Sequence, residues 1–207
     1  MINNYKKVYD DMNNLLITPK IIRETDRGYS VYDIQDEMLS HRQIECVGSI
    51  DKESVYSLIM QLRYLQMQDK DAEITMYINS PGGEVSSGMA LYDVMQAVSC
   101  PIRTVCVGTA ASMAAVLFAA GDRREMLPHA SVMIHDPLIS GGLGGSALHI
   151  QSISQDLMRT RDVICQTLAK HTGRTIDEIY DKTKTDSYFY GEDAVEFGLA
   201  DKVITEI

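Results

Sequence analysis

A serine and a histidine occupy positions in this chain that would suit an acyl-transfer reaction. Ser112 follows the apolar segment 102–107 and the small residues 108–111, and a helix-like run continues to Ala120. This pattern predicts a strand, a tight turn and a helix, with Ser112 in the first helical turn, where backbone N–H groups lack internal partners and favour negative charge. A serine there can attack a carbonyl carbon while neighbouring amides receive the oxyanion. Alternatively, the small residues serve only to let a helix pack closely, and the serine alone does not decide between these interpretations.

His135 ends a predicted strand, 131–135, from which it could reach Ser112 as a general base. Such a base contributes roughly a hundred- to a ten-thousand-fold in rate, whereas a purely structural role is the alternative. Asp136 is a poor partner for His135, because successive residues of an extended chain point to opposite faces. Asp186 lies in a loop that could fold back, and no local feature distinguishes it from a solvated aspartate. The other histidines lie in polar segments and are expected to be exposed: His41, His129, His149 and His171.

Two glycine-rich segments invite a functional interpretation. Ser80-Pro81-Gly82-Gly83 follows a predicted strand, 74–79, and precedes a predicted helix that continues to Val98. Its glycines permit positive φ and close backbone approach, so an amide there and the Met113 amide could converge on one anion. The segment 140–145 predicts either an edge strand that pairs with an extended peptide or a mobile surface loop. It lacks the Gly-Lys-Ser/Thr ending of a phosphate-binding loop, so nucleotide binding is not expected.

The remaining pattern alternates strands with helices. Extended segments are predicted at 15–24, 43–47 and 202–207, with a turn at 25–28. Helices are predicted at 33–39, 51–66 with Asp51 as its cap, 147–170 and 193–198. Together with the units around Ser112 and Gly82, this order predicts a mainly parallel, layered α/β sheet.

Composition narrows the possible functions. The 207 residues suffice for one core, and the net charge of −10 with no basic cluster argues against nucleic-acid binding. The longest apolar stretch is too short to cross a bilayer, and the N-terminus lacks the apolar core of a secretory signal, so no membrane contact is expected. Of the four cysteines only Cys100 and Cys106 lie close in sequence, and none forms a Cys-x-x-Cys pair, which predicts reduced thiols in a cytoplasmic protein. No cluster has metal-ligand spacing, and no metal or cofactor is expected.

From about Leu15 to its C-terminus the chain resembles the ClpP family, the proteolytic subunits of ATP-dependent Clp proteases. The motifs that carry the resemblance occur in the family's order and are highly specific as a set. They are Tyr77-Ile78-Asn79-Ser80-Pro81-Gly82-Gly83, Ala110-Ala111-Ser112-Met113, Val132-Met133-Ile134-His135, His171-Thr172-Gly173 and Asp193-Ala194-Val195-Glu196-Phe197-Gly198-Leu199.

The resemblance implies a Ser–His–Asp triad of Ser112, His135 and Asp186, with the backbone amides of Gly83 and Met113 as the oxyanion hole. It implies a single crotonase-like layered α/β domain, 15–207, with a projecting helical handle at about 138–170. Residues 1–14 would be a flexible segment or a propeptide. It also implies heptameric rings that stack into a tetradecamer, and a Clp-type AAA+ ATPase that unfolds polypeptide substrates and feeds them into the chamber.

Some residues depart from the family pattern. Lys184-Thr185 replaces the Asp-Arg pair that often bridges the two rings, and Thr75 replaces a tyrosine of the ATPase-docking groove. Ala114 stands where the family usually has glycine. These changes favour a divergent paralogue that forms mixed rings with a second ClpP, and a weakly active or non-catalytic regulatory subunit is one alternative. A crotonase-type acyl-CoA enzyme is another, because that family shares the fold and uses paired amides for an oxyanion.

Overall fold

The computed structural model describes residues 20–26, 28–139, 141–142 and 144–207. Backbone contacts divide the chain into two compact units, Met1–His41 and Arg42–Ile207. The predicted flexible segment or propeptide, 1–14, lies outside the described residues.

The first unit contains a β-hairpin and a short helix. Strand β1 (Lys20–Thr25) pairs antiparallel with β2 (Gly28–Asp33), and the expected turn at 25–28 joins them. Helix α2 (Ile34–Ser40) follows, with Asp33 as its N-cap in a capping box. The helix predicted at 33–39 is therefore confirmed, whereas β2 was not predicted.

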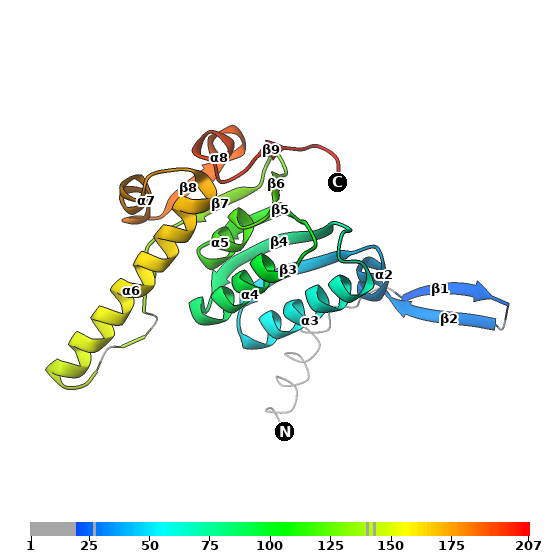
Figure 1. The fold of residues 1–207 in the computed structure, drawn as a ribbon, viewed down its shortest axis with the longest axis horizontal. Coiled ribbons are helices and arrows are strands. Elements are labelled where there is room, and N and C mark those ends of the chain that lie inside the picture. Colours follow the sequence, from blue (N-terminus) through cyan, green and yellow to red (C-terminus); the bar gives the residue numbers. More distant parts are fainter. Residues whose placement is uncertain (1–19, 27, 140, 143) are drawn as a thin grey trace, which may run out of the picture. The chain divides into compact units, whose positions relative to one another are not determined.

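The second unit contains one mixed sheet and its helices, which are labelled in Figure 1. In chain order the elements are β3 (Gln43–Ile50), α3 (Lys52–Gln68), β4 (Ile74–Gly83), α4 (Val85–Ala97), β5 (Ile102–Ala111), α5 (Met113–Ala119), β6 (Arg123–Met126), β7 (Ser131–Ile134), α6 (Ala147–Thr172), α7 (Ile176–Thr183), β8 (Ser187–Tyr190), α8 (Gly191–Phe197) and β9 (Lys202–Val203).

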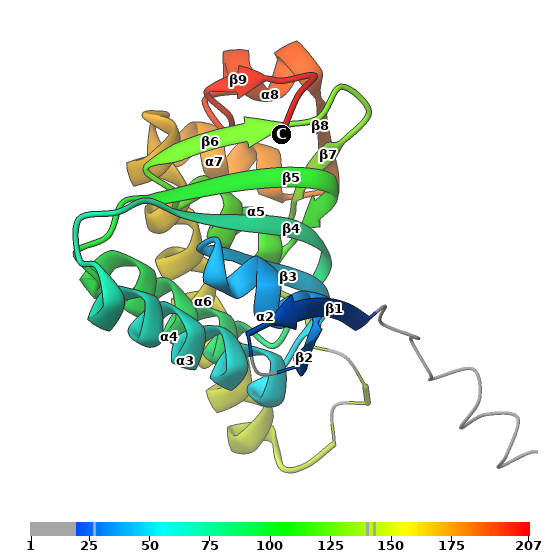
Figure 2. The same cartoon turned by 90° about the vertical axis from the view of Figure 1, so that its right-hand side faces the viewer.

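The sheet has seven strands among the described residues, and its main path follows the order β3-β4-β5-β6-β9 with every neighbour parallel. The first half of β5 pairs with β6 and its last residues pair with β7, as Figure 2 lets the reader follow. Strand β8 pairs antiparallel with β7. The mainly parallel α/β fold predicted from the sequence is confirmed.

Helix α5 forms the centre of the core, because all seven of its residues are buried. It packs against β4 and β5 and contacts both α4 and α6. A helix that is apolar on every side is stable only when surrounded by other elements. Residues at its start are therefore held by packing from several directions.

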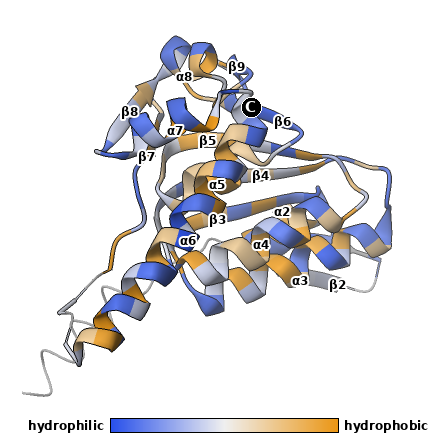
Figure 3. Ribbon diagram, turned by 60° about the vertical axis from the view of Figure 1, so that its left-hand side comes forward, coloured by the Kyte–Doolittle hydropathy of each residue, from blue (hydrophilic) through white to orange (hydrophobic). Residues whose placement is uncertain are grey.

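Helix α6 extends away from the sheet over its N-terminal half, as Figures 1 and 3 show. Its buried residues, Ile164, Cys165, Thr167 and Leu168, all lie in the C-terminal half. Leu148 and Met158 in the other half are exposed. This arrangement matches the projecting helix expected at 147–170.

Several boundaries differ from those predicted. Strand β4 continues to Gly83 and β5 to Ala111, so both run through the segments expected as turns. Strands β6 and β8 and helix α7 were not predicted, because each is short and takes its partners from distant parts of the chain. The closing strand predicted at 202–207 ends at Val203. No strand forms among the described residues of 135–146, so the edge strand considered for 140–145 is not present there.

Candidate active site

The turn that carries Ser112 is sharply bent. Ser112 has φ 57° and ψ −121°, between the end of β5 and the first residue of α5. Residues with a side chain rarely adopt such angles, and where they do the surrounding structure must hold them. Here the Ser112 N–H donates to the carbonyl of Met133 at 2.8 Å.

Strand pairing brings His135 to Ser112. The parallel register of β5 and β7 places Ala111 beside Met133. Ser112 therefore leaves the sheet next to the end of β7, where His135 follows. The Ser112 Oγ lies 2.8 Å from the His135 Nε2.

Strand β8 brings Asp186 to the other side of the imidazole. The antiparallel register of β7 and β8 pairs Ile134 with Ser187, so the next residues outward are His135 and Asp186. The Asp186 Oδ1 lies 3.6 Å from the His135 Nδ1, within ion-pair range but longer than a hydrogen bond. The His135 side chain is 14% exposed and that of Asp186 is 61% exposed.

The residues expected to form an oxyanion hole lie at the adjoining turn. Gly83 ends β4, and Met113 begins α5, where a helix leaves its first N–H groups without intrahelical partners. A Cβ at Gly82 would stand 2.8 Å from the Ser112 Cβ and 3.0 Å from the Met113 nitrogen. A Cβ at Gly83 would meet the Ile50 carbonyl oxygen at 2.1 Å. Both glycines are therefore required by close backbone approach, at positive φ.

A small pocket opens beside Ser112 and His135. Its other lining residues are apolar and come from α4, α5, α6 and the end of β7. They are Val85, Met113, Val116, Ile134, Pro137, Ile164 and Leu168. Its free volume is about 10 Å³, room for no more than one water molecule, so in this conformation it does not hold a substrate side chain.

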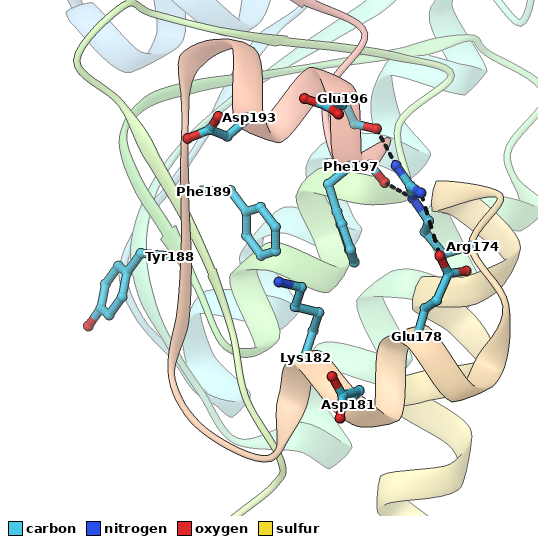
Figure 4. Close-up of a pocket in the computed structure, with 9 residues that line it drawn as sticks. All are labelled: Arg174, Glu178, Asp181, Lys182, Tyr188, Phe189, Asp193, Glu196 and Phe197. Carbon is cyan, nitrogen blue, oxygen red and sulfur yellow. Dashed lines mark hydrogen bonds and ion pairs between the residues drawn. The ribbon is translucent and has the colours of Figure 1, made fainter.

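A second pocket lies between α7, β8 and α8 and contains none of the predicted site residues. Figure 4 shows the rings of Phe189 and Phe197 inside it and charged side chains at its edge. Arg174 donates its Nε to the Phe197 carbonyl at 3.1 Å, and the two rings lie 4.5 Å apart. Neither Ser112 nor His135 lines this pocket, so the proposed chemistry is not placed there.

Sequence reasoning missed two features near the site. The first is the pocket wall, which α4 and α6 supply from distant parts of the chain. The second is an ion pair between Asp136 and Arg161, whose Nε donates to the Asp136 Oδ2 at 2.7 Å.

The expectation that His171 is exposed was wrong, because its ring is half-buried and its Nε2 lies 3.0 Å from the Tyr92 hydroxyl. Its position on the inner face of a long helix was the only signal in the sequence.

The sequence of the chain matches the model of a known protein family. The model of the Clp protease family matches residues 26–207, nearly the whole chain. The chain belongs to the Clp protease family. Membership implies peptidase chemistry in general, and the mixed α/β fold is consistent with it. Among the described residues of this Clp protease family member, no helix is both long and apolar enough to span a membrane.

Proposed function

We propose that this chain is a serine endopeptidase subunit that hydrolyses unfolded polypeptides with Ser112, His135 and Asp186. The observation that carries the proposal is the 2.8 Å separation of the Ser112 Oγ and the His135 Nε2, with Asp186 facing the other ring nitrogen. That separation lies within the reach a general base needs.

In the proposed reaction His135 takes the Ser112 proton as the Oγ attacks the substrate carbonyl carbon. The Gly83 and Met113 amides donate to the oxyanion that forms. The imidazolium then gives its proton to the leaving amine, and the scissile C–N bond breaks to leave an acyl-enzyme. Water attacks that ester with His135 again as base, and the acid product leaves Ser112 free.

Asp186 keeps the His135 Nδ1 protonated and stabilises the imidazolium. Its 3.6 Å separation means that the pair must tighten during the reaction. Apo structures commonly show such longer catalytic contacts. The crotonase-type alternative needs no serine nucleophile with a histidine base, so the Ser112–His135 contact favours the peptidase.

The exposed apolar residues of α6, such as Leu148, support stacking of heptameric rings through this handle. A Clp-type ATPase as feeding partner follows from the family. The four buried, free cysteines support a reducing, cytoplasmic compartment.

The test is peptide hydrolysis by the purified chain and its Ser112→Ala variant. We expect hydrolysis of a short fluorogenic peptide, and its loss in Ser112→Ala. Ser57→Ala is the matched control, because that exposed α3 hydroxyl interacts only locally with Gln61, and it should retain full activity. Undiminished turnover in Ser112→Ala would exclude the proposed nucleophile.

A further inference from the structure

Asp136 follows His135 directly and takes no part in the proposed proton transfers. Its carboxylate accepts from the Arg161 Nε at 2.7 Å, and Arg161 belongs to the handle helix α6. Its backbone N–H donates to the Thr183 carbonyl at 2.7 Å, at the last residue of α7. One residue thus joins the His135 segment to two helices.

Arg161 is itself tightly held. Its guanidinium carbon lies 4.2 Å from the centre of the Tyr180 ring, and its Nη2 donates to the Tyr180 carbonyl at 3.4 Å. The Tyr180 hydroxyl donates to Asp162 at 2.8 Å. Planar stacking and a fork of donors are properties of arginine that lysine does not reproduce. The guanidinium therefore fixes where the Asp136 carboxylate can lie.

The residues on both sides of the loop that carries Asp186 make contacts with the segment 134–136. On one side Thr183, which is fully buried, bonds to Asp136. On the other side Ser187 pairs with Ile134, and its hydroxyl donates to the Lys182 carbonyl at 2.7 Å. His135 and Asp186 therefore sit on two segments that Asp136 ties together.

The ion pair is not an arrangement that stability alone favours. The side chains of Asp136 and Arg161 are 34% and 17% exposed. Within the described part of the chain, the buried Asp136 Oδ1 has no hydrogen-bond partner. A buried carboxylate oxygen without a donor costs free energy, and buried ion pairs often stabilise no better than apolar side chains. Fixing one geometry is a role that such a pair can fill.

We propose that Asp136 and Arg161 are positioning residues of the triad: their ion pair holds the segment bearing His135 on α6 and α7, and so fixes how Asp186 approaches the imidazole. This inference rests on the proposed peptidase function. It also means that the handle helix acts on the geometry of the reacting groups through a defined contact.

The test compares Asp136→Asn, Arg161→Gln and the double variant by kcat, KM and the rate of fluorophosphonate labelling. Each single variant should lower kcat and the labelling rate about ten- to a hundred-fold, because small displacements of catalytic groups are that costly. KM should change less than kcat, because neither Asp136 nor Arg161 lines the pocket beside Ser112. The double variant should lose no more than either single one, since both remove the same contact. Arg161→Lys should recover only part of the loss.

Asp156→Asn is the matched control. Asp156 pairs with Arg159 on the same helix α6, but that pair is exposed and lies outside the junction. This variant should keep kcat within about twofold. Native mass and melting temperature measured alongside show whether each variant folds and assembles.

Full kcat in Asp136→Asn or Arg161→Gln would overturn the inference, and so would a loss that merely follows unfolding or disassembly. If Asp136→Asn does not assemble, Arg161→Gln decides, because it removes the charge, and a normal kcat in that variant contradicts the inference. Wild-type protein that neither hydrolyses peptide nor becomes labelled at Ser112 would instead refute the proposed function itself.

Discussion

Ser112 has a backbone conformation that is costly for a residue with a side chain, about 1–3 kcal/mol for such outliers in general. The bond from its N–H to Met133 and the buried helix α5 behind it hold that conformation. The same bend turns the hydroxyl toward His135. The strained residue is thus the one with the proposed chemical role.

Asp186→Asn tests the third member of the triad. The amide nearly preserves shape but removes the charge that compensates the imidazolium and can favour the wrong tautomer. We expect kcat to fall about a hundred- to ten-thousand-fold with little change in KM. Steady-state peptide hydrolysis measures both constants. Activity close to that of the wild type would show that Asp186 does not serve His135.

The residues of the site differed in how well the sequence revealed them. Ser112 and His135 follow recognisable strands, so local pattern suggested both. Asp186 was implied only by family resemblance, because its position depends on β8 pairing with β7, a contact between distant segments. The sequence did not favour Asp136 as a partner for His135, and it gave no hint of Arg161, the partner of Asp136, which lies on a helix 25 positions away in sequence.

At the scale of elements, helices α4 and α6 meet at Tyr92 and His171, and His171 is titratable. Burial first, and then the charges of Lys170 and Arg124, lower the pKa of His171 below its usual 6.5. Neutral His171 can accept a hydrogen bond from Tyr92, whose hydroxyl is 3.0 Å away. The folded state therefore favours the unprotonated ring.

Because folding lowers the pKa of His171, we predict that the free energy of unfolding depends on pH. As the pH falls through 6.5 the unfolded chain binds a proton before the folded chain does, so the free energy of unfolding decreases. The loss is complete below the lowered pKa. Chemical unfolding followed by circular dichroism between about pH 5 and pH 8 measures it. In His171→Gln the free energy of unfolding should no longer change with pH in this range. In Lys170→Gln the change should be smaller than in the wild type. An unchanged slope in His171→Gln would contradict the assignment of this pH dependence to His171.

Elements with strong local signals were predicted well. Helix α3 begins after Asp51, whose carboxylate accepts from the Glu53 and Ser54 amides, as the sequence suggested. Strands β4 and β5 were predicted too short, because Pro81 and the glycines read as turn residues while tertiary pairing keeps those segments in the sheet. Local propensity yields to such contacts, so the ends of elements were the least predictable part of the fold.

At the scale of the whole molecule, two features of the chain bear on its assembly into rings. The N-terminal half of α6 exposes Leu148 and Met158, as expected of a helix that meets another copy. Lys184 bonds to Asp181 at 2.8 Å within its own segment and occupies a position where the family often carries a ring-bridging pair. Its charge is therefore engaged inside the subunit.

We predict that the chain alone forms heptameric rings but stacks weakly into a tetradecamer, because the bridging ion pair is absent. A second ClpP-type chain that supplies the missing charges should restore stacking. Native mass spectrometry of the chain alone, and of the mixture, measures this. A robust tetradecamer of the chain alone, stable at high salt, would contradict the prediction.

The most direct test of the account is the site of covalent modification by a fluorophosphonate. Intact-mass and peptide-mapping spectra should show one adduct per active chain, located on Ser112, and its formation should slow sharply in His135→Ala. An adduct on another serine, or equal labelling in the absence of His135, would contradict the proposed nucleophile and base.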